Sequence, residues 1–129
     1  MSNLDIDFFK AAIYNKIDQT KFYLHLGANV NYQDETGNTA LMRAAWDGRT
    51  ELVDILLRSG ADVAITNDHG YTALIRASWY GWTDVVKLLL EAGSDPNVIN
   101  YKGEAPLSHV KWNGHDAIEK LLIQYGAKE

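Results

Sequence analysis

Serine and histidine are the residues of this sequence whose chemistry could support catalysis or metal binding. Ser108 and His109 are adjacent, but neighbours on a helix point in different directions, so the pair cannot act as nucleophile and base. His25, His69 and His115 do not share a helix at the spacing of a two-histidine metal site. The absence of cysteine removes thiolate zinc sites, disulfides and cysteine nucleophiles. The sequence therefore predicts a protein that is not an enzyme and that uses no metal or cofactor.

Tryptophan and arginine recur at a fixed spacing, and their chemistry is that of binding. Trp46, Trp79 and Trp112 are 33 residues apart, and Arg43 and Arg76 each stand three residues before a tryptophan. Residues three or four apart lie on one face of a helix. Trp, Tyr and Arg dominate protein interfaces because they bury a large area with few rotamers. We therefore predict a binding surface in which a basic column, which also includes Lys10 and His109, runs beside an aromatic column.

Two groups of residues are the candidates for contact with a partner. The first group belongs to the two columns and the loop after them: Arg43, Trp46, Asp47, Arg76, Trp79, Tyr80, Trp82, His109, Trp112 and Asn113. The second group belongs to the expected hairpin tips: Glu35, Asn38, Asp68, His69, Tyr71 and Tyr101. Acidic tips beside a basic wall would favour association rate and orientation more than affinity. As an alternative, the indoles stack internally and take a guanidinium from Arg43 or Arg76, and the tip tyrosines are scattered surface aromatics.

These candidates are positioned by an internal repeat of 33 residues. Three columns of glycine keep this period: Gly27, Gly60, Gly93 and Gly126; Gly37, Gly70 and Gly103; Gly48, Gly81 and Gly114. Such a period is typical of a stacked array, because one short unit cannot bury its apolar face alone. We predict a single domain over residues 1–129, with units at 4–36, 37–69, 70–102 and 103–129.

Each unit is predicted to hold two short helices and a turn. The first helix covers residues 39–47, with Thr39 as its N-cap and Gly48 ending it. The second covers residues 51–58, whose apolar residues form a broad face. The connection to the next unit is a tight, hairpin-like loop with positive φ at Gly70.

Residues 37–48 with 56–63, and again 70–81 with 89–97, resemble the ankyrin repeat, and the match covers residues 5–127. The resemblance implies an all-α solenoid of helix-turn-helix units joined by β-hairpin-like loops. It also implies recognition of another protein through the first-helix surface and the hairpin tips.

The sequence departs from the family pattern at several positions. The family's Thr-Pro-Leu-His becomes Thr-Ala-Leu-Met at residues 39–42 and Thr-Ala-Leu-Ile at residues 72–75. Packing of Met42 and Ile75 would then replace the hydrogen bonds of the usual histidine. Trp82 replaces a family histidine and extends the aromatic area or covers a loop, whereas His115 keeps that structural position.

The end units carry polar residues where the middle units are apolar. Gln19 and Thr20 correspond to Leu52 and Val53, and Lys111 corresponds to small residues of the middle units. Because a terminal unit has one face in water, we expect both ends to be closed and the chain to be complete. Ile6, Phe8 and Phe9 are expected on the inward side of the first unit.

Composition limits the class of protein and of partner. The 129 residues are 47% hydrophobic and 22% charged, with a net charge of −5, which is typical of an ordered globular domain. The sequence shows neither a secretory signal nor an apolar stretch long enough to span a membrane, so a cytoplasmic location is expected. The acidic balance argues against nucleic-acid binding through Arg43 and Arg76, because phosphate contacts depend on basic residues.

The sequence thus favours a binding protein that is a monomer on its own and docks another protein. It would act as an inhibitor, an immunity-type protein, a regulatory subunit or an adaptor. The alternative is a structural protein that forms a homodimer through Trp79, Tyr80 and Trp82.

Overall fold

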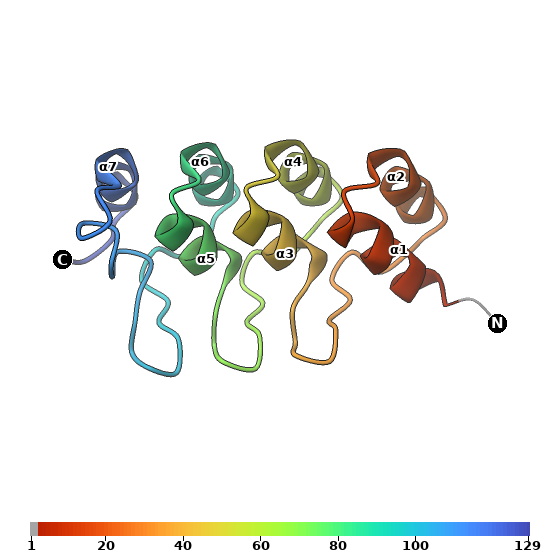
Figure 1. Cartoon of the computed structure of the whole chain (residues 1–129), viewed down its shortest axis with the longest axis horizontal. Helices are drawn as coiled ribbons and strands as arrows, with labels where there is room; N and C mark the ends of the chain where they lie inside the picture. Colours follow the sequence, from red (N-terminus) through yellow and green to blue (C-terminus); the bar gives the residue numbers. More distant parts are fainter. Residues whose placement is uncertain (1–2) are drawn as a thin grey trace.

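The computed structural model describes residues 3–129, which form seven α-helices and no β-strand. The helices are α1 (Leu4–Ile13), α2 (Ile17–His25), α3 (Ala40–Asp47), α4 (Thr50–Arg58), α5 (Ala73–Tyr80), α6 (Thr83–Glu91) and α7 (Asp116–Gln124). Figure 1 shows them in two rows, with α1, α3 and α5 in one row and α2, α4, α6 and α7 in the other. The long loops between pairs project together beside the first row. This architecture confirms the all-α repeat solenoid.

The predicted caps fix where the first-row helices begin and end. The Thr39 hydroxyl accepts the N–H of Met42 at 3.2 Å, and Thr72 caps α5 in the same way. Gly48 and Gly81 end α3 and α5 with φ of 70° and 84°, a left-handed conformation that glycine adopts without a steric penalty. Helices α3 and α5 therefore occupy the same register in their units, whereas α1 begins earlier, after Asn3.

The core runs along the array between the two rows. Helices pack as the pairs α1/α2, α3/α4 and α5/α6, and α3 contacts both α1 and α5. The fully buried residues include Leu41, Leu52, Leu56, Leu74, Val85, Leu89, Ile118 and Leu122. Met42 and Ile75 are 3% and 0% exposed, as expected if packing replaces the family's histidine. Over residues 3–129, no helix combines the length and apolarity that crossing a membrane requires.

The first unit closes its end of the core only partly as predicted. Phe8 and Phe9 are buried as expected, and Gln19 is exposed. Thr20, however, is 0% exposed rather than facing water. Its hydroxyl donates to the backbone oxygen of Lys16 at 2.7 Å. This local bond satisfies the hydroxyl, so the side chain can occupy an apolar position.

The fourth unit departs from the prediction because residues 106–114 form consecutive turns rather than a first helix. The expectation that His109, Trp112 and Asn113 share a helix face is therefore wrong. Ala105 stands where Thr39 and Thr72 cap the middle helices and offers no side-chain oxygen. Without a cap, a short helix leaves its first N–H groups unsatisfied.

Candidate functional site

The first-helix wall, meaning the surface formed by α1, α3, α5 and residues 106–113, is held together by contacts between units. At its centre the Arg76 guanidinium carbon lies 3.9 Å from the ring centroids of both Trp46 and Tyr71. A cation over two aromatic faces is an attractive arrangement that also shields those faces from a partner. For Arg76 the structure therefore agrees with the internal-stacking alternative, because the guanidinium lies over two rings of the wall itself.

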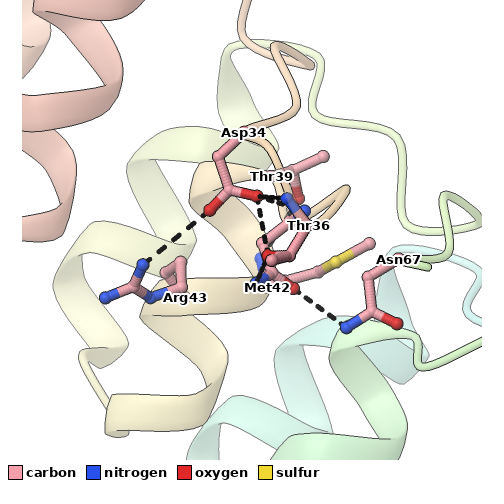
Figure 2. Close-up of polar contacts among 7 residues, drawn as sticks. Asp34, Thr36, Thr39, Met42, Arg43 and Asn67 are labelled. Atoms are coloured by element: carbon pink, nitrogen blue, oxygen red, sulfur yellow. Dashed lines mark hydrogen bonds and ion pairs between the residues drawn. The ribbon is translucent and has the colours of Figure 1, made fainter. Parts of the chain in front are cut away.

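Arg43 does not repeat the arrangement of Arg76. Its guanidinium lies 4.0 Å from the Asp34 carboxylate in the loop between α2 and α3 (Figure 2), and its side chain is 37% exposed. A half-exposed pair at this distance adds little stability. Arg43 thus keeps a charged group available on the wall.

Trp79 joins the third unit to the fourth. Its indole N–H donates to the backbone oxygen of Ala105 at 3.1 Å. Its ring meets Tyr71 and His109 edge-on, with centroids 5.6 Å and 4.8 Å apart. Trp79 therefore stabilises the contact between the third and fourth units and also belongs to the first-helix wall.

Trp82 and His115 cover the loops that end the first-row helices. The Trp82 indole N–H donates to the backbone oxygen of Trp46 at 2.8 Å. Its ring lies so close to Gly48 that a Cβ there would be 2.4 Å from the ring. His115 covers Gly81 equivalently, with the imidazole 2.6 Å from where a Cβ would stand. Trp82 thus covers a loop, one of the two roles expected, and His115 keeps its predicted packing role.

The remaining wall candidates face solvent. Trp112 is 89% exposed and Tyr80 49% exposed, although Tyr80 also lies 6.0 Å from Trp46, ring centroid to ring centroid. Asp47 and Asn113 are exposed as well. The candidates therefore divide into those that hold the wall together and those available to a partner, with Trp112 the most available.

The hairpin tips are built by a polar column that the sequence analysis missed. The Asp34 carboxylate accepts the N–H groups of Thr36 and Asn38 at 2.9 Å each (Figure 2). Asn67 and Asn100 accept two N–H groups of their own loops in the same way. The signal was present, because these three residues are 33 apart and Asp and Asn favour such turns.

Neighbouring tips are also tied to one another. The Asn67 amide donates to the Asn38 side chain at 3.0 Å (Figure 2), and the Asp68 N–H donates to the Thr36 backbone oxygen at 3.0 Å. Asn38 is therefore engaged in the fold, whereas the side chains of Glu35 and Asp68 are exposed.

The third tip presents an aromatic ring. The Tyr101 N–H donates to the backbone oxygen of His69 at 3.1 Å, and its ring lies against Gly70, where a Cβ would be 2.7 Å away. Tyr101 nevertheless remains 76% exposed, and His69 is exposed beside it. Of the two candidate tyrosines at the tips, Tyr101 is the one a partner could reach, because Tyr71 packs against Arg76 and Trp79.

An acid–base pair connects the last tip to the turns of the fourth unit. His109 Nε2 lies 2.7 Å from Glu104 Oε2, and Asn100 also donates to the Glu104 carboxylate at 3.1 Å. The hydrogen bond from His109, followed by that from Asn100, lowers the pKa of Glu104, because both stabilise the ionised form. Within residues 3–129, no three His, Asp or Glu side chains gather as metal ligands would.

Comparison with known proteins identifies the repeat. The family model described as ankyrin repeats, in three copies, matches residues 8–100. The matched range ends before the turns at residues 106–114. No curated protein matches the chain.

Proposed function

The chain belongs to the ankyrin repeat family, and from this premise we propose that it docks a partner protein across its first-helix wall and hairpin tips. Ankyrin repeats are generally non-enzymatic modules for protein–protein interaction. The domain proposed to carry this function is the whole chain, in four units.

The observation that carries the proposal is the exposure of large aromatic side chains along the wall and tips. Tyr14 is 71% exposed, Tyr80 49%, Tyr101 76% and Trp112 89%. Burial of such rings releases much apolar surface, and their polar atoms can still bond to a partner. Trp46, Trp79 and Arg76 support this surface from within, through the contacts between units.

The acidic tips would orient the partner. Glu35 and Asp68 project from consecutive loops, while Arg43 and Lys10 lie on the wall. Such separation of charge steers association. A small array of this kind suits a cytoplasmic inhibitor, immunity-type protein or regulatory subunit, monomeric until it covers a partner's active surface.

The test is capture of a partner with variants that spare the supporting contacts. We expect Tyr80→Ala with Trp112→Ala to lose a partner that the unaltered chain captures from an extract of the source cells. Phe22→Ala is the control, because Phe22 is 57% exposed on α2 in the other row. Circular dichroism and thermal unfolding verify that each variant is folded. Equal capture by all three proteins would exclude the wall as the binding surface.

The alternative function is self-association through the aromatic surface. Tyr80 is the last residue of α5 and Trp82 directly precedes α6. Their side chains are 49% and 40% exposed, and two copies of the chain could bury these rings against each other. Sedimentation equilibrium over a wide concentration range distinguishes the two functions. A constant monomer mass excludes the homodimer, whereas a dimer that Tyr80→Ala dissociates would replace the partner-binding proposal.

A further inference from the structure

The turns at residues 106–113 occupy the place of a first-row helix. The repeat of 33 residues aligns them with α5 (Ala73–Tyr80) and, one unit earlier, with α3 (Ala40–Asp47). Val110, aligned with the buried Ala77, is itself 0% exposed. The segment is therefore anchored in the core at its middle while its backbone is unwound.

The backbone of this segment is strained at one residue. His109 has φ of 71°, in the left-handed region that residues with a Cβ rarely adopt. The aligned Arg76 is helical. His109 is held in place by the Glu104 carboxylate at 2.7 Å and by Trp79 at 4.8 Å between ring centroids. The contacts with Glu104 and Trp79 offset the backbone strain at His109, so this conformation is maintained by the residues around it.

The local hydrogen bonds at the start of the turn differ from those at the start of α5 in which half of the cap is present. In α5 the Thr72 hydroxyl accepts the N–H of Ile75, three residues later. In the fourth unit the hydroxyl of Ser108 accepts the N–H of Ala105, three residues earlier, at 3.0 Å, as the third residue of a capped helix does in a capping box. Alanine at position 105 therefore removes the N-cap acceptor but leaves the other half of the cap and the rest of the helix sequence in place.

The structure also leaves room beside the segment. A cleft of about 390 Å³ is lined by Leu107, Trp112 and Ile123 among others. The Trp112 indole at its edge is 89% exposed. The exposed residues 111–113 could therefore change their path toward solvent and this cleft, while Val110 keeps the segment anchored in the core.

We propose that residues 106–113 are a conformational switch between this turn and an eight-residue helix that completes the first-helix wall. In the helical state Trp112 stands in the column of Trp46 and Trp79, and His109 shares its face. In the turn state Trp112 is 89% exposed at the edge of the cleft. The inference concerns the chain alone and holds whether or not the proposed partner exists.

The first test restores the missing cap. In Ala105→Thr the new hydroxyl can accept the Ser108 N–H, as Thr72 accepts that of Ile75, and we expect the helix-to-turn ratio to rise about fivefold. Ala105→Val is the matched control, because valine has the shape of threonine without the oxygen. Backbone carbon chemical shifts of residues 106–113 in the full chain report the ratio. A gain of helix in both variants would overturn the role of the cap.

The second test changes the backbone preference at the strained residue. His109→Ala and His109→Gly remove the same imidazole contacts, but alanine favours the helix and glycine tolerates positive φ. We expect the two variants to differ at least about tenfold in helix-to-turn ratio, with alanine the more helical. If Ala105→Thr combined with His109→Ala keeps the same non-helical shifts as His109→Gly, the segment is a fixed turn and the proposal is wrong.

Discussion

Arg76 and His109 hold equivalent positions in consecutive units, and each lies against the tryptophan of the unit before it. Arg76 lies 3.9 Å from the centroids of Trp46 and Tyr71. His109 meets Trp79 edge-on at 4.8 Å and pairs with Glu104, the residue aligned with Tyr71. In the middle of the array the Arg76 guanidinium thus lies over two aromatic rings. In the last unit the His109 imidazole instead lies between one ring, that of Trp79, and the Glu104 carboxylate.

This difference shows that residues of one column of the repeat have different surroundings in the middle and last units. In the middle units the following unit covers part of each tryptophan, and Trp46 and Trp79 become structural. In the last unit Trp112 is 89% exposed. The exposure of a periodic aromatic residue therefore depends on whether residues of another unit pack against it.

The largest expected effect compares the core of a middle unit with that of the last. Leu74 is 1% exposed, and Leu107, at the same position one unit later, is half-buried. We expect Leu74→Ala to lower the free energy of unfolding by about 2–5 kcal/mol, because it leaves a cavity between packed units. Leu107→Ala should cost about 1 kcal/mol, because its site is open to solvent and can relax. Chemical denaturation measures both, and equal losses would contradict the contrast.

The glycines that follow the first helix position of each unit also differ between a middle unit and the last unit. Gly48 and Gly114 have φ of 70° and 74°, but only Gly48 is covered by the Trp82 ring. Gly114→Ala should cost about 1 kcal/mol for the left-handed backbone alone. Gly48→Ala should cost about 3 kcal/mol, because the added methyl also displaces the indole. Thermal unfolding of the two variants provides the comparison, and a larger loss at Gly114 would disprove the role of Trp82.

The cation at the centre of the wall gives a smaller effect. Arg76→Met keeps the length of the side chain but removes its charge from between two rings, and should cost about 1–2 kcal/mol. Arg43→Met should cost about 0–1 kcal/mol, because the Asp34 pair is half-exposed. A double-mutant cycle of Arg76→Met with Trp46→Leu isolates the contact. Strictly additive losses would show that the guanidinium does not depend on the indole.

The fold was predictable because the repeat carries the same local signals in each middle unit. Thr39 and Gly48 marked the ends of α3 by residue type alone, and the structure confirms both. The first helix of the fourth unit was predicted wrongly, because residues 106–113 align with α5 but lack its capping residue. Ala105 replaces the capping threonine, while the residues that define the 33-residue period, such as Leu107, Trp112 and Gly114, are unchanged.

The candidate site was less predictable than the fold. Spacing placed Trp46, Trp79 and Trp112 in one column, but exposure depends on the unit that follows each residue, which spacing does not reveal. The hydrogen bond from Trp79 to Ala105 joins residues of different units. The repeat spacing therefore indicates the surface but not which of its residues support it and which are exposed to a partner.

The smallest expected effect is a pH dependence that arises from Glu104 in the last unit. Hydrogen bonds from His109 and Asn100 lower the pKa of Glu104 in the folded chain. The unfolded state therefore binds a proton at higher pH than the folded state, and the stability that this carboxylate contributes is complete above its ordinary pKa. That contribution decreases below about pH 5 and is lost once the pH falls below the lowered pKa.

Glu104→Gln removes this titration while keeping a side chain of similar shape. We expect the unaltered chain to be the more stable of the two at about pH 6 and the difference to shrink as the pH falls to about 3. Glu35→Gln, at an exposed tip, controls for the loss of one negative charge. Urea unfolding at several pH values measures the differences. Parallel stability curves for Glu104→Gln and the unaltered chain would show that the last unit is held by its packing on Trp79 and not by its acid–base pair.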